Sequence, residues 1–368
     1  MRRTPALIVG GGPAGAATAI GFARAGVPHL LLERSRETGD ALCGGFLSWR
    51  TLETLAGLGI DPDALNPARV TDVRLFAGTR RAEAKLPRPA INVSRHRLDT
   101  VLLAEAERLG SAVERGVTVR EIDARTVRTA DGATMTTDAL FLASGKHDIR
   151  GLARPEEARG ADPTLGLRVH ITPSPALARS LAGRIELHLF DRGYAGLALQ
   201  EDGRANLCLA VHRSRLQEAG TPRQLLDALG RELPALGEWI ARIADPVDAI
   251  ANVPYGWRER HGEAGLFRLG DQAGVIPSLA GEGMGIALAS GVAAADAYRR
   301  DGPGAAADWQ VDFARRIARP IGVAGLVRRV AETAGAAWLL PMVRPSLIRL
   351  VAHATRIAPQ PAVPDLRL

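Results

Sequence analysis

The sequence predicts an α/β fold with an α+β insert, in which a domain with a parallel sheet is interrupted by an antiparallel sheet and followed by a helical C-terminus. Three observations lead to this prediction: a glycine-rich turn near the N-terminus, four strand-like segments between residues 167 and 212, and an apolar, arginine-bearing segment after residue 301. The chain has 368 residues, 46% of them hydrophobic, so it can bury a large core.

The N-terminal turn lies between a predicted strand, Ala6 to Val9, and a predicted helix, Ala16 to Ala25. It reads Gly10-Gly11-Gly12-Pro13-Ala14-Gly15, the pattern G-x-G-x-x-G. Gly10 permits the tight turn, Gly12 lets a pyrophosphate approach the backbone, and Gly15 lets the helix pack on the strand. A second apolar run, 29–32, ends at Glu33, which is placed to accept hydrogen bonds from a ribose. Together these features predict a Rossmann-like dinucleotide-binding domain.

A second glycine-rich segment, GDQAGVIPSLAGEGMGIALASG, runs from Gly270 to Gly291. Its glycines directly precede a helical stretch, and a helix N-terminus offers unpaired N–H groups and the positive end of a dipole. Glu33 argues against a 2′-phosphate, so the tightly held nucleotide is FAD or NAD(H). Because a flavin dinucleotide is long and needs a second anchor, the segment favours FAD.

Three motifs in this order resemble those of the para-hydroxybenzoate hydroxylase-like flavoproteins, which include aromatic hydroxylases, geranylgeranyl reductases and flavin-dependent halogenases. They are Gly10–Gly15 with Glu33, the segment Ala143-Ser144-Gly145-Lys146-His147-Asp148 after a predicted strand 139–142, and Gly270-Asp271 with its turn. The resemblance covers roughly residues 5 to 300 and implies noncovalently bound FAD. It implies that Asp271 bonds the ribityl chain, that Arg95 helps to hold the flavin, and that the amides around Gly283, Met284 and Gly285 face its N1/O2 edge. The cofactor-binding residues predicted in this way are Gly10, Gly12, Pro13, Ala14, Gly15, Glu33, Arg34, Arg95, Ser144, Gly145, Gly270, Asp271, Gly281, Gly283, Met284 and Gly285.

The middle of the chain predicts an antiparallel sheet, with strands at 167–172, 184–190, 194–199 and 205–212. By the resemblance, this sheet covers the flavin ring and forms the far wall of the substrate pocket. We therefore divide the chain into four parts: 1–165, the first part of the FAD-binding domain; 166–248, the substrate domain; 249–300, the return to the FAD-binding domain; and 301–368, C-terminal helices.

The reaction type is less clearly indicated. Ser144-Gly145 stands where many hydroxylases have Asp-Gly, which leaves open whether NAD(P)H or another donor reduces the flavin. Cys43-Gly44-Gly45 resembles the Cys-Gly-Gly of geranylgeranyl reductases, and the G-E-G-M sequence around Glu282 also leans toward reductases. The tryptophan-bearing halogenase signature is absent. We favour a monooxygenase acting on an apolar aromatic, phenolic or polyketide-like compound; the alternative is a reductase or dehydrogenase acting on an isoprenoid or other alkene.

Four residues are the main candidates for catalysis: Cys43, His170, His188 and Tyr194. Tyr255 and Trp257, beyond the sheet, are two further candidates. A histidine or tyrosine on a strand that faces the flavin can orient a phenol or act as a general base. Each of them alone could equally be a structural residue of the core or of the pocket rim, with its polar atoms hydrogen-bonded. No spacing of Cys, His or acidic residues suggests a metal site.

Charge and composition limit the partners. The net charge is +7 and the pI about 10.3, but the arginines are scattered singly, so we expect no nucleic-acid partner and an apolar small-molecule substrate. Two cysteines fit a reducing cytoplasm. In the C-terminal region, Arg328, Arg329, Arg344, Arg349 and Arg356 interrupt the apolar residues. We expect helices there that either cap the pocket or make a peripheral contact with a membrane surface; the oligomeric state is not indicated.

Overall fold

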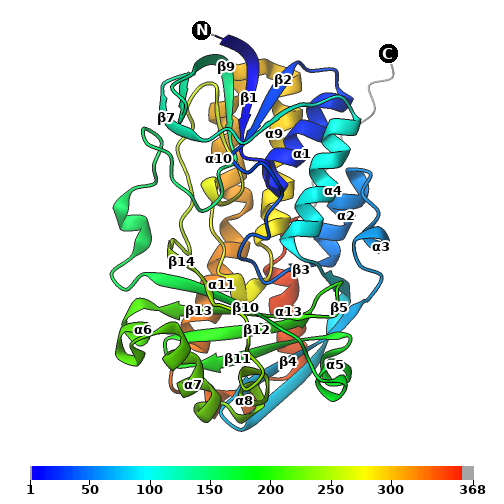
Figure 1. The fold of residues 1–368 in the computed structure, drawn as a ribbon, viewed down its shortest axis with the longest axis vertical. Coiled ribbons are helices and arrows are strands. Elements are labelled where there is room, and N and C mark those ends of the chain that lie inside the picture. The colour runs from blue at the N-terminus through cyan, green and yellow to red at the C-terminus, as the bar shows by residue number, and fades with distance from the viewer. Residues whose placement is uncertain (1, 359–368) are drawn as a thin grey trace.

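Two sheets form the framework of the protein, whose computed structural model describes residues 2–358 (Figure 1). The first sheet has four parallel strands in the order β6 (Ala112–Arg115), β2 (His29–Glu33), β1 (Arg2–Val9) and β9 (Thr134–Leu142). β15 (Leu266–Arg268) pairs in parallel with the end of β9, and β8 (Thr126–Thr129) and β7 (Val119–Asp123) continue the sheet in antiparallel fashion. The return of the chain to this sheet after residue 249 is therefore made by β15.

Helices α1 (Pro13–Arg24), α4 (Arg95–Arg108) and α9 (Gly283–Asp301) pack with this sheet around a core rich in alanine and aliphatic side chains. The predicted helices 16–25 and 99–109 lie within one turn of α1 and α4. α1 and α9 come very close, because a Cβ at Gly291 would lie 2.3 Å from the backbone oxygen of Ala14. This close packing fixes the N-termini of both helices relative to each other.

The second sheet has eight strands in the order β14 (Asp248–Val253), β10 (Thr164–Ile171), β13 (Ala205–His212), β12 (Gly193–Leu199), β11 (Arg184–Phe190), β4 (Val70–Ala77), β5 (Arg80–Asn92) and β3 (Phe46–Leu47). The four predicted strands coincide with β10 to β13. Three strands from before residue 165 also belong here, so the sheet does not follow the division at 165/166. β4 pairs in parallel with β11, in the register Asp72 to Arg184, a contact between distant residues that has no local sequence signal.

One face of the second sheet is covered by α5 (Pro175–Leu181), α6 (Arg213–Ala219), α7 (Pro222–Glu232) and α8 (Pro234–Ile240). On the other side lie α11 (Ala318–Ala331), α12 (Ala336–Leu339) and α13 (Pro345–Ala354), orange to red in Figure 1. α10 (Ala306–Arg316) packs on β15, and α2 (Trp49–Gly57) and α3 (Pro62–Leu65) lie beside α4 in Figure 1. The predicted C-terminal region is helical as far as the structure describes it, up to residue 358; residues 359–368 lie outside the described residues.

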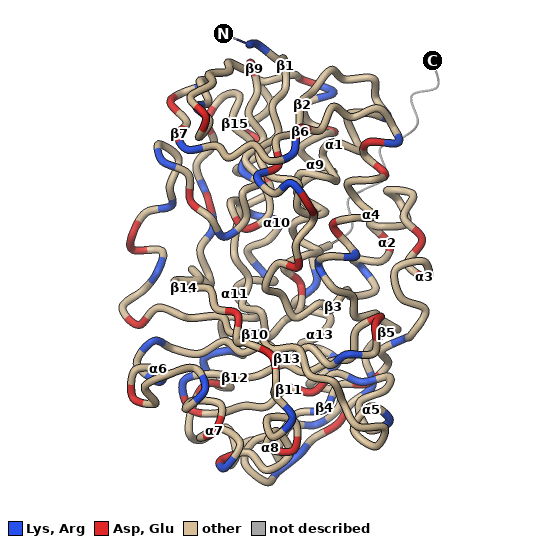
Figure 2. The backbone as a smooth tube through the Cα atoms, in the orientation of Figure 1, with Lys and Arg blue, Asp and Glu red and all other residues tan. Residues whose placement is uncertain are grey.

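Charged residues of both signs are interspersed along most of the described trace (Figure 2). Within residues 2–358, no helix is long and apolar enough to cross a bilayer.

Candidate active site

A cavity of about 1320 Å³ runs from the glycine-rich turn of the first sheet to the C-terminal helices. Its wall includes 14 of the predicted cofactor residues: Gly10, Gly12, Pro13, Ala14, Glu33, Arg34, Arg95, Ser144, Gly145, Gly270, Asp271, Gly281, Gly283 and Met284. Gly15 and Gly285 are not part of the wall. The three motifs, up to 270 residues apart in the sequence, therefore meet at one site.

The glycines of the first motif have different roles. Gly10 has φ +109°, and a Cβ there would lie 2.4 Å from the backbone oxygen of Ala143. A Cβ at Gly15 would lie 1.9 Å from the backbone oxygen of Gly10, so both positions need glycine for backbone packing. Gly12 faces the cavity with φ −70° and ψ −174°, and no side chain caps the N-terminus of α1. The free amides of this helix end therefore point to an anion site.

Two charged side chains stand next to this turn. The carboxylate of Glu33 accepts hydrogen bonds from the amides of Gly11 (2.7 Å) and Ser35 (2.8 Å), which fixes its position in the cavity wall. Arg95 forms a bidentate ion pair with Asp99 at 2.9 and 2.6 Å. Burial alone would lower the pKa of Arg95, but the Asp99 carboxylate more than offsets this and raises it, so the guanidinium stays charged. A Cβ at Gly12 would lie 3.3 Å from that guanidinium.

The second and third motifs are joined by two residues that sequence analysis did not identify. The buried amide of Gln272 donates to the backbone oxygens of Gly145 (2.9 Å) and His147 (3.1 Å). Arg154 donates to the backbone oxygens of Lys146 (2.7 Å) and Asp271 (3.1 Å). Gln272 adjoins Asp271 and could have been noticed, whereas nothing around Arg154 in the sequence marks it.

Arg34 adds a further link to the second motif, since its guanidinium lies 2.9 Å from Nε2 of His147. Burial, together with the charge of Arg34, lowers the pKa of His147. This histidine is therefore neutral at pH 7.

The third motif presents two groups to the cavity. The Asp271 carboxylate lines the wall and accepts no hydrogen bond from any residue of 2–358. The N-terminus of α9 begins at Gly283, where a Cβ would meet nothing within 4 Å, and it has no side-chain cap. Gly285 differs from the prediction: a Cβ there would lie 2.7 Å from the Glu282 and Thr51 side chains, so this glycine makes room for Glu282.

Glu282 forms a buried clamp with the C-terminal end of the described chain. Its fully buried carboxylate accepts from Arg356 (2.5 Å), Ser48 (2.9 Å) and the amide of Ile357 (3.2 Å). Arg356 also donates to the backbone oxygens of Gly281 (3.2 Å) and Ala280, and its guanidinium lies over the Trp49 ring at 5.4 Å. The last turn before α9 is thus fixed by a residue 74 positions away.

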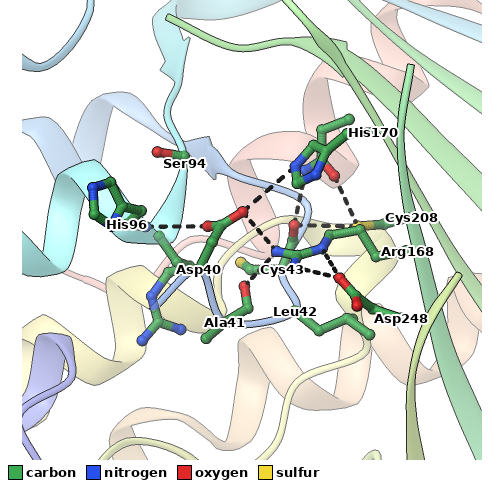
Figure 3. A network of polar contacts seen from close by, with 12 residues as sticks. Asp40, Ala41, Leu42, Cys43, Ser94, His96, Arg168, His170, Cys208 and Asp248 are labelled. Atoms are coloured by element: carbon green, nitrogen blue, oxygen red, sulfur yellow. Dashed lines mark hydrogen bonds and ion pairs between the residues drawn. The ribbon is translucent and has the colours of Figure 1, made fainter. Parts of the chain in front are cut away.

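Cys43 lies in a loop, 39–45, that a polar network attaches to the second sheet (Figure 3). Arg168 donates to Asp40 (2.9 Å), to the backbone oxygen of Ala41 (3.1 Å) and to Asp248 (2.6 Å). The backbone oxygen of Cys43 accepts from the Cys208 thiol at 3.1 Å. Burial raises the pKa of Cys208 to about 12, so this thiol stays protonated.

The structure separates the predicted catalytic residues. Cys43 and Tyr194 line the cavity, whereas His170 and His188 are outside its wall. His188 is fully buried on the opposite side of β11 from Leu187 and Leu189, and stacks on Phe76 at 4.7 Å. Successive side chains on a strand point to opposite faces of the sheet. Leu187 and Leu189 therefore face the cavity, and the prediction that His188 faces it was wrong. Nε2 of His170 lies 3.5 Å from Asp40, so His170 belongs to the loop network.

Tyr194 belongs to a hydroxyl cluster in the cavity wall. Its hydroxyl bonds the Ser278 hydroxyl, which is 2.6 Å from the Tyr255 hydroxyl. Burial raises the pKa of Tyr194 well above its usual value, so its hydroxyl is neutral. Trp257 lies outside the wall, under the guanidinium of Arg154 at 5.7 Å. Ser278 precedes the Gly281–Gly283 turn directly, which places these hydroxyls next to the third motif.

Beyond this cluster the cavity becomes aliphatic. Leu75 of β4 and Leu187 of β11 form one wall, and α11 and α13 form the other. The apolar side chains that line this end are Val73, Leu75, Leu86, Ile185, Leu187, Leu189, Val323, Leu326, Val327, Val330, Leu339, Leu340, Val343, Leu347, Ile348 and Val351. Such a wall accommodates an apolar molecule.

The residues at the polar end fit FAD. Gly12 leaves the space that a pyrophosphate needs, the Asp271 carboxylate is available to a ribityl hydroxyl, and two uncapped helix N-termini suit a pyrophosphate and an anionic ring edge. Comparison with known proteins agrees with this fit. Residues 3–150 match a family model described as an FAD binding domain. No curated protein sequence matches the chain.

Several solved structures share the fold of nearly the whole chain. A flavoprotein/dehydrogenase from Cytophaga hutchinsonii has a TM-score of 0.79 at 17% identity, covering 96% of this chain and 92% of its own. PqsL, a probable FAD-dependent monooxygenase from Pseudomonas aeruginosa, has a TM-score of 0.70 at 17% identity, covering 93% and 100%. A geranylgeranyl bacteriochlorophyll reductase-like protein from Thermoplasma acidophilum has a TM-score of 0.68 at 18% identity, covering 97% and 94%.

The family model shows an FAD-binding domain over residues 3–150, and the solved structures show that nearly the whole chain has the fold of these flavoproteins.

Proposed function

We propose that the protein is an FAD-dependent monooxygenase that hydroxylates an apolar aromatic, phenolic or polyketide-like compound. The observation that carries the proposal is the continuous cavity, polar where it fits FAD and aliphatic beyond the Tyr194–Ser278–Tyr255 cluster. Bound FAD would pass two electrons from NAD(P)H or another donor to O₂, one oxygen atom entering the substrate and the other leaving as water.

The side chains would position the substrate and control its protons. The aliphatic wall excludes water and holds an apolar ring, and the hydroxyls of Tyr194, Ser278 and Tyr255 are in the wall to bond a phenol oxygen. Because Tyr194 is neutral, it can donate to that oxygen or exchange a proton with it through Ser278. The uncapped N-terminus of α9 would help to hold FAD and would stabilise negative charge on it.

A reductase acting on an isoprenoid or other alkene is the second candidate. It is favoured by the place of Cys43, since the Cys43-Gly44-Gly45 segment lines the cavity and the Cys43 thiol is available as a proton donor. The similarity to the geranylgeranyl reductase-like structure also supports it.

Oxygen dependence separates the two candidates. The FAD-loaded protein would be reduced without air and mixed with a long-chain phenol or an isoprenoid alkene, with and without O₂. We expect the phenol to accelerate reoxidation only with O₂ and to yield a hydroxylated product, while small anionic acids have no effect. Rapid anaerobic reoxidation by the alkene would instead establish the reductase.

A further inference from the structure

The exposed large apolar side chains of the protein are concentrated in one segment. Among residues 2–358, all seven of them lie between 326 and 350: Leu326, Val330, Trp338, Leu339, Met342, Leu347 and Leu350. Trp338, Met342 and Leu350 are exposed by 74%, 76% and 62%. α13 contains no buried residue, although it is one of the more amphipathic helices. Exposed large apolar side chains that are concentrated in this way mark an interaction site.

This surface is continuous with the cavity. Leu326, Val330, Leu339 and Leu347 are both exposed and part of the cavity wall, so they form its mouth. Trp338, Met342 and Leu350 are exposed but are not part of the wall. The apolar end of the cavity thus opens onto apolar surface.

Within the segment that carries this surface, the exposed charges are of one sign. Residues 333–358 contain no Asp or Glu, and Arg344 and Arg349 are exposed between the apolar residues. Arg329 is exposed beside Val330, and the guanidinium of Arg80 lies over the Trp338 ring at 4.8 Å. Glu332, the nearest acid in the sequence, is paired with Arg328 at 2.7 Å with its side chain 8% exposed. Surfaces that combine tryptophan and leucine with flanking arginines bind the interface of an anionic lipid bilayer.

We infer that Trp338, Met342 and Leu350, with Arg329, Arg344 and Arg349, form a docking surface for an anionic lipid bilayer. The three apolar side chains enter the headgroup region and the arginines contact lipid phosphates. In this orientation the mouth formed by Leu326, Val330, Leu339 and Leu347 faces the bilayer, so an apolar substrate reaches the cavity without crossing water. The entry of substrate from the bilayer rests on the proposed function, whereas the docking of the protein on the bilayer does not.

Vesicle flotation of the full-length, FAD-loaded protein tests the inference without any substrate. The protein would be mixed with vesicles of phosphatidylcholine alone or of phosphatidylcholine with phosphatidylglycerol. We expect flotation with the anionic vesicles only. The triple variant Trp338→Ser/Met342→Ser/Leu350→Ser and the double variant Arg344→Glu/Arg349→Glu should each reduce the floated fraction about tenfold.

Arg260→Glu, an exposed arginine in the segment before β15, is the matched control and should float like the wild type. Retained FAD absorbance shows that each variant is folded, because none of the changed residues lines the cavity. Wild-type protein that stays unbound with both kinds of vesicle would overturn the inference. So would a dimer that the triple variant converts to monomers without loss of lipid binding, since the surface would then join two copies of the chain.

Discussion

The two ends of the cavity are built on different principles. At the FAD end, backbone groups and glycines form the wall, and Gly10, Gly12 and Gly283 matter because they carry no side chain. At the other end, aliphatic side chains from β4, β11, α11 and α13 form the wall, and no backbone group is needed. A wall made of backbone accepts one ligand shape, whereas a wall made of side chains can change by substitution while the fold stays the same. The cofactor is therefore more strongly specified than the substrate.

Gly12→Val should have the largest effect, because it should abolish FAD binding. The φ of −70° suits any residue, so the fold should survive, but the side chain would occupy the space of the pyrophosphate. We expect the purified variant to be colourless and to bind no added FAD, measured by fluorescence quenching. Gly57→Val, at the end of α2 with nothing within 4 Å of its Cβ, is the control and should remain yellow. Equal affinity in Gly12→Val and wild type would contradict the site.

Arg356→Leu tests the clamp that joins the C-terminal segment to the FAD end. Removing one partner of a buried ion pair leaves the Glu282 carboxylate uncompensated, so the free energy of unfolding should fall by about 3–5 kcal/mol. The double variant Glu282→Gln/Arg356→Leu should recover part of this loss in a denaturant titration. Arg260→Leu serves as the control. If Arg356→Leu were as stable as the wild type, the Glu282–Arg356 ion pair would contribute little to the free energy of unfolding.

Asp271→Ala should have a smaller effect than Gly12→Val. It removes one acceptor from the cavity wall, and a lost hydrogen bond to a charged group is worth about 1–3 kcal/mol, roughly one to two orders of magnitude in the Kd for FAD. Titration calorimetry would measure the change against Asp227→Ala, a half-buried residue of α7 that is not part of the cavity wall. An unchanged Kd for Asp271→Ala would remove this residue from the site.

The smallest expected effect concerns His212, which helps to attach α11 to the second sheet. Its Nε2 lies 3.0 Å from Glu332, and this hydrogen bond raises the pKa of His212 above 6.5. A raised pKa stabilises the folded state fully below the unfolded pKa of 6.5, and the gain is lost as the pH rises through the folded pKa. The free energy of unfolding should therefore fall by less than about 1 kcal/mol between about pH 6 and about pH 8, and the Tm should decline slightly over the same range. His212→Asn should lack this decline.

The sequence predicted the residues at the FAD end of the cavity far better than the contacts that join distant parts of the chain. The glycine pattern, Glu33 and Asp271 are local signals, and the strands β10 to β13 alternate clearly enough to be placed within three residues. Contacts between distant residues have no such signal. The pairing of β4 with β11, the links made by Arg154 and the Glu282–Arg356 clamp appear only in three dimensions. For His188 the alternation was recognised, but which face of β11 meets the cavity depends on that pairing.

The most direct test of the account is to fill the apolar end of the cavity and to measure both ligands in the same protein. Leu75→Trp places an indole in the wall formed by β4, which belongs to the second sheet, whereas the first glycine-rich turn follows a strand of the first sheet. We predict that its Kd for FAD stays within about twofold of the wild type, because independent sites do not couple. A long-chain phenol should no longer accelerate reoxidation of the reduced protein by O₂. Phenol-dependent reoxidation at the wild-type rate in Leu75→Trp, with FAD bound normally, would contradict the assignment of the aliphatic end as the substrate site.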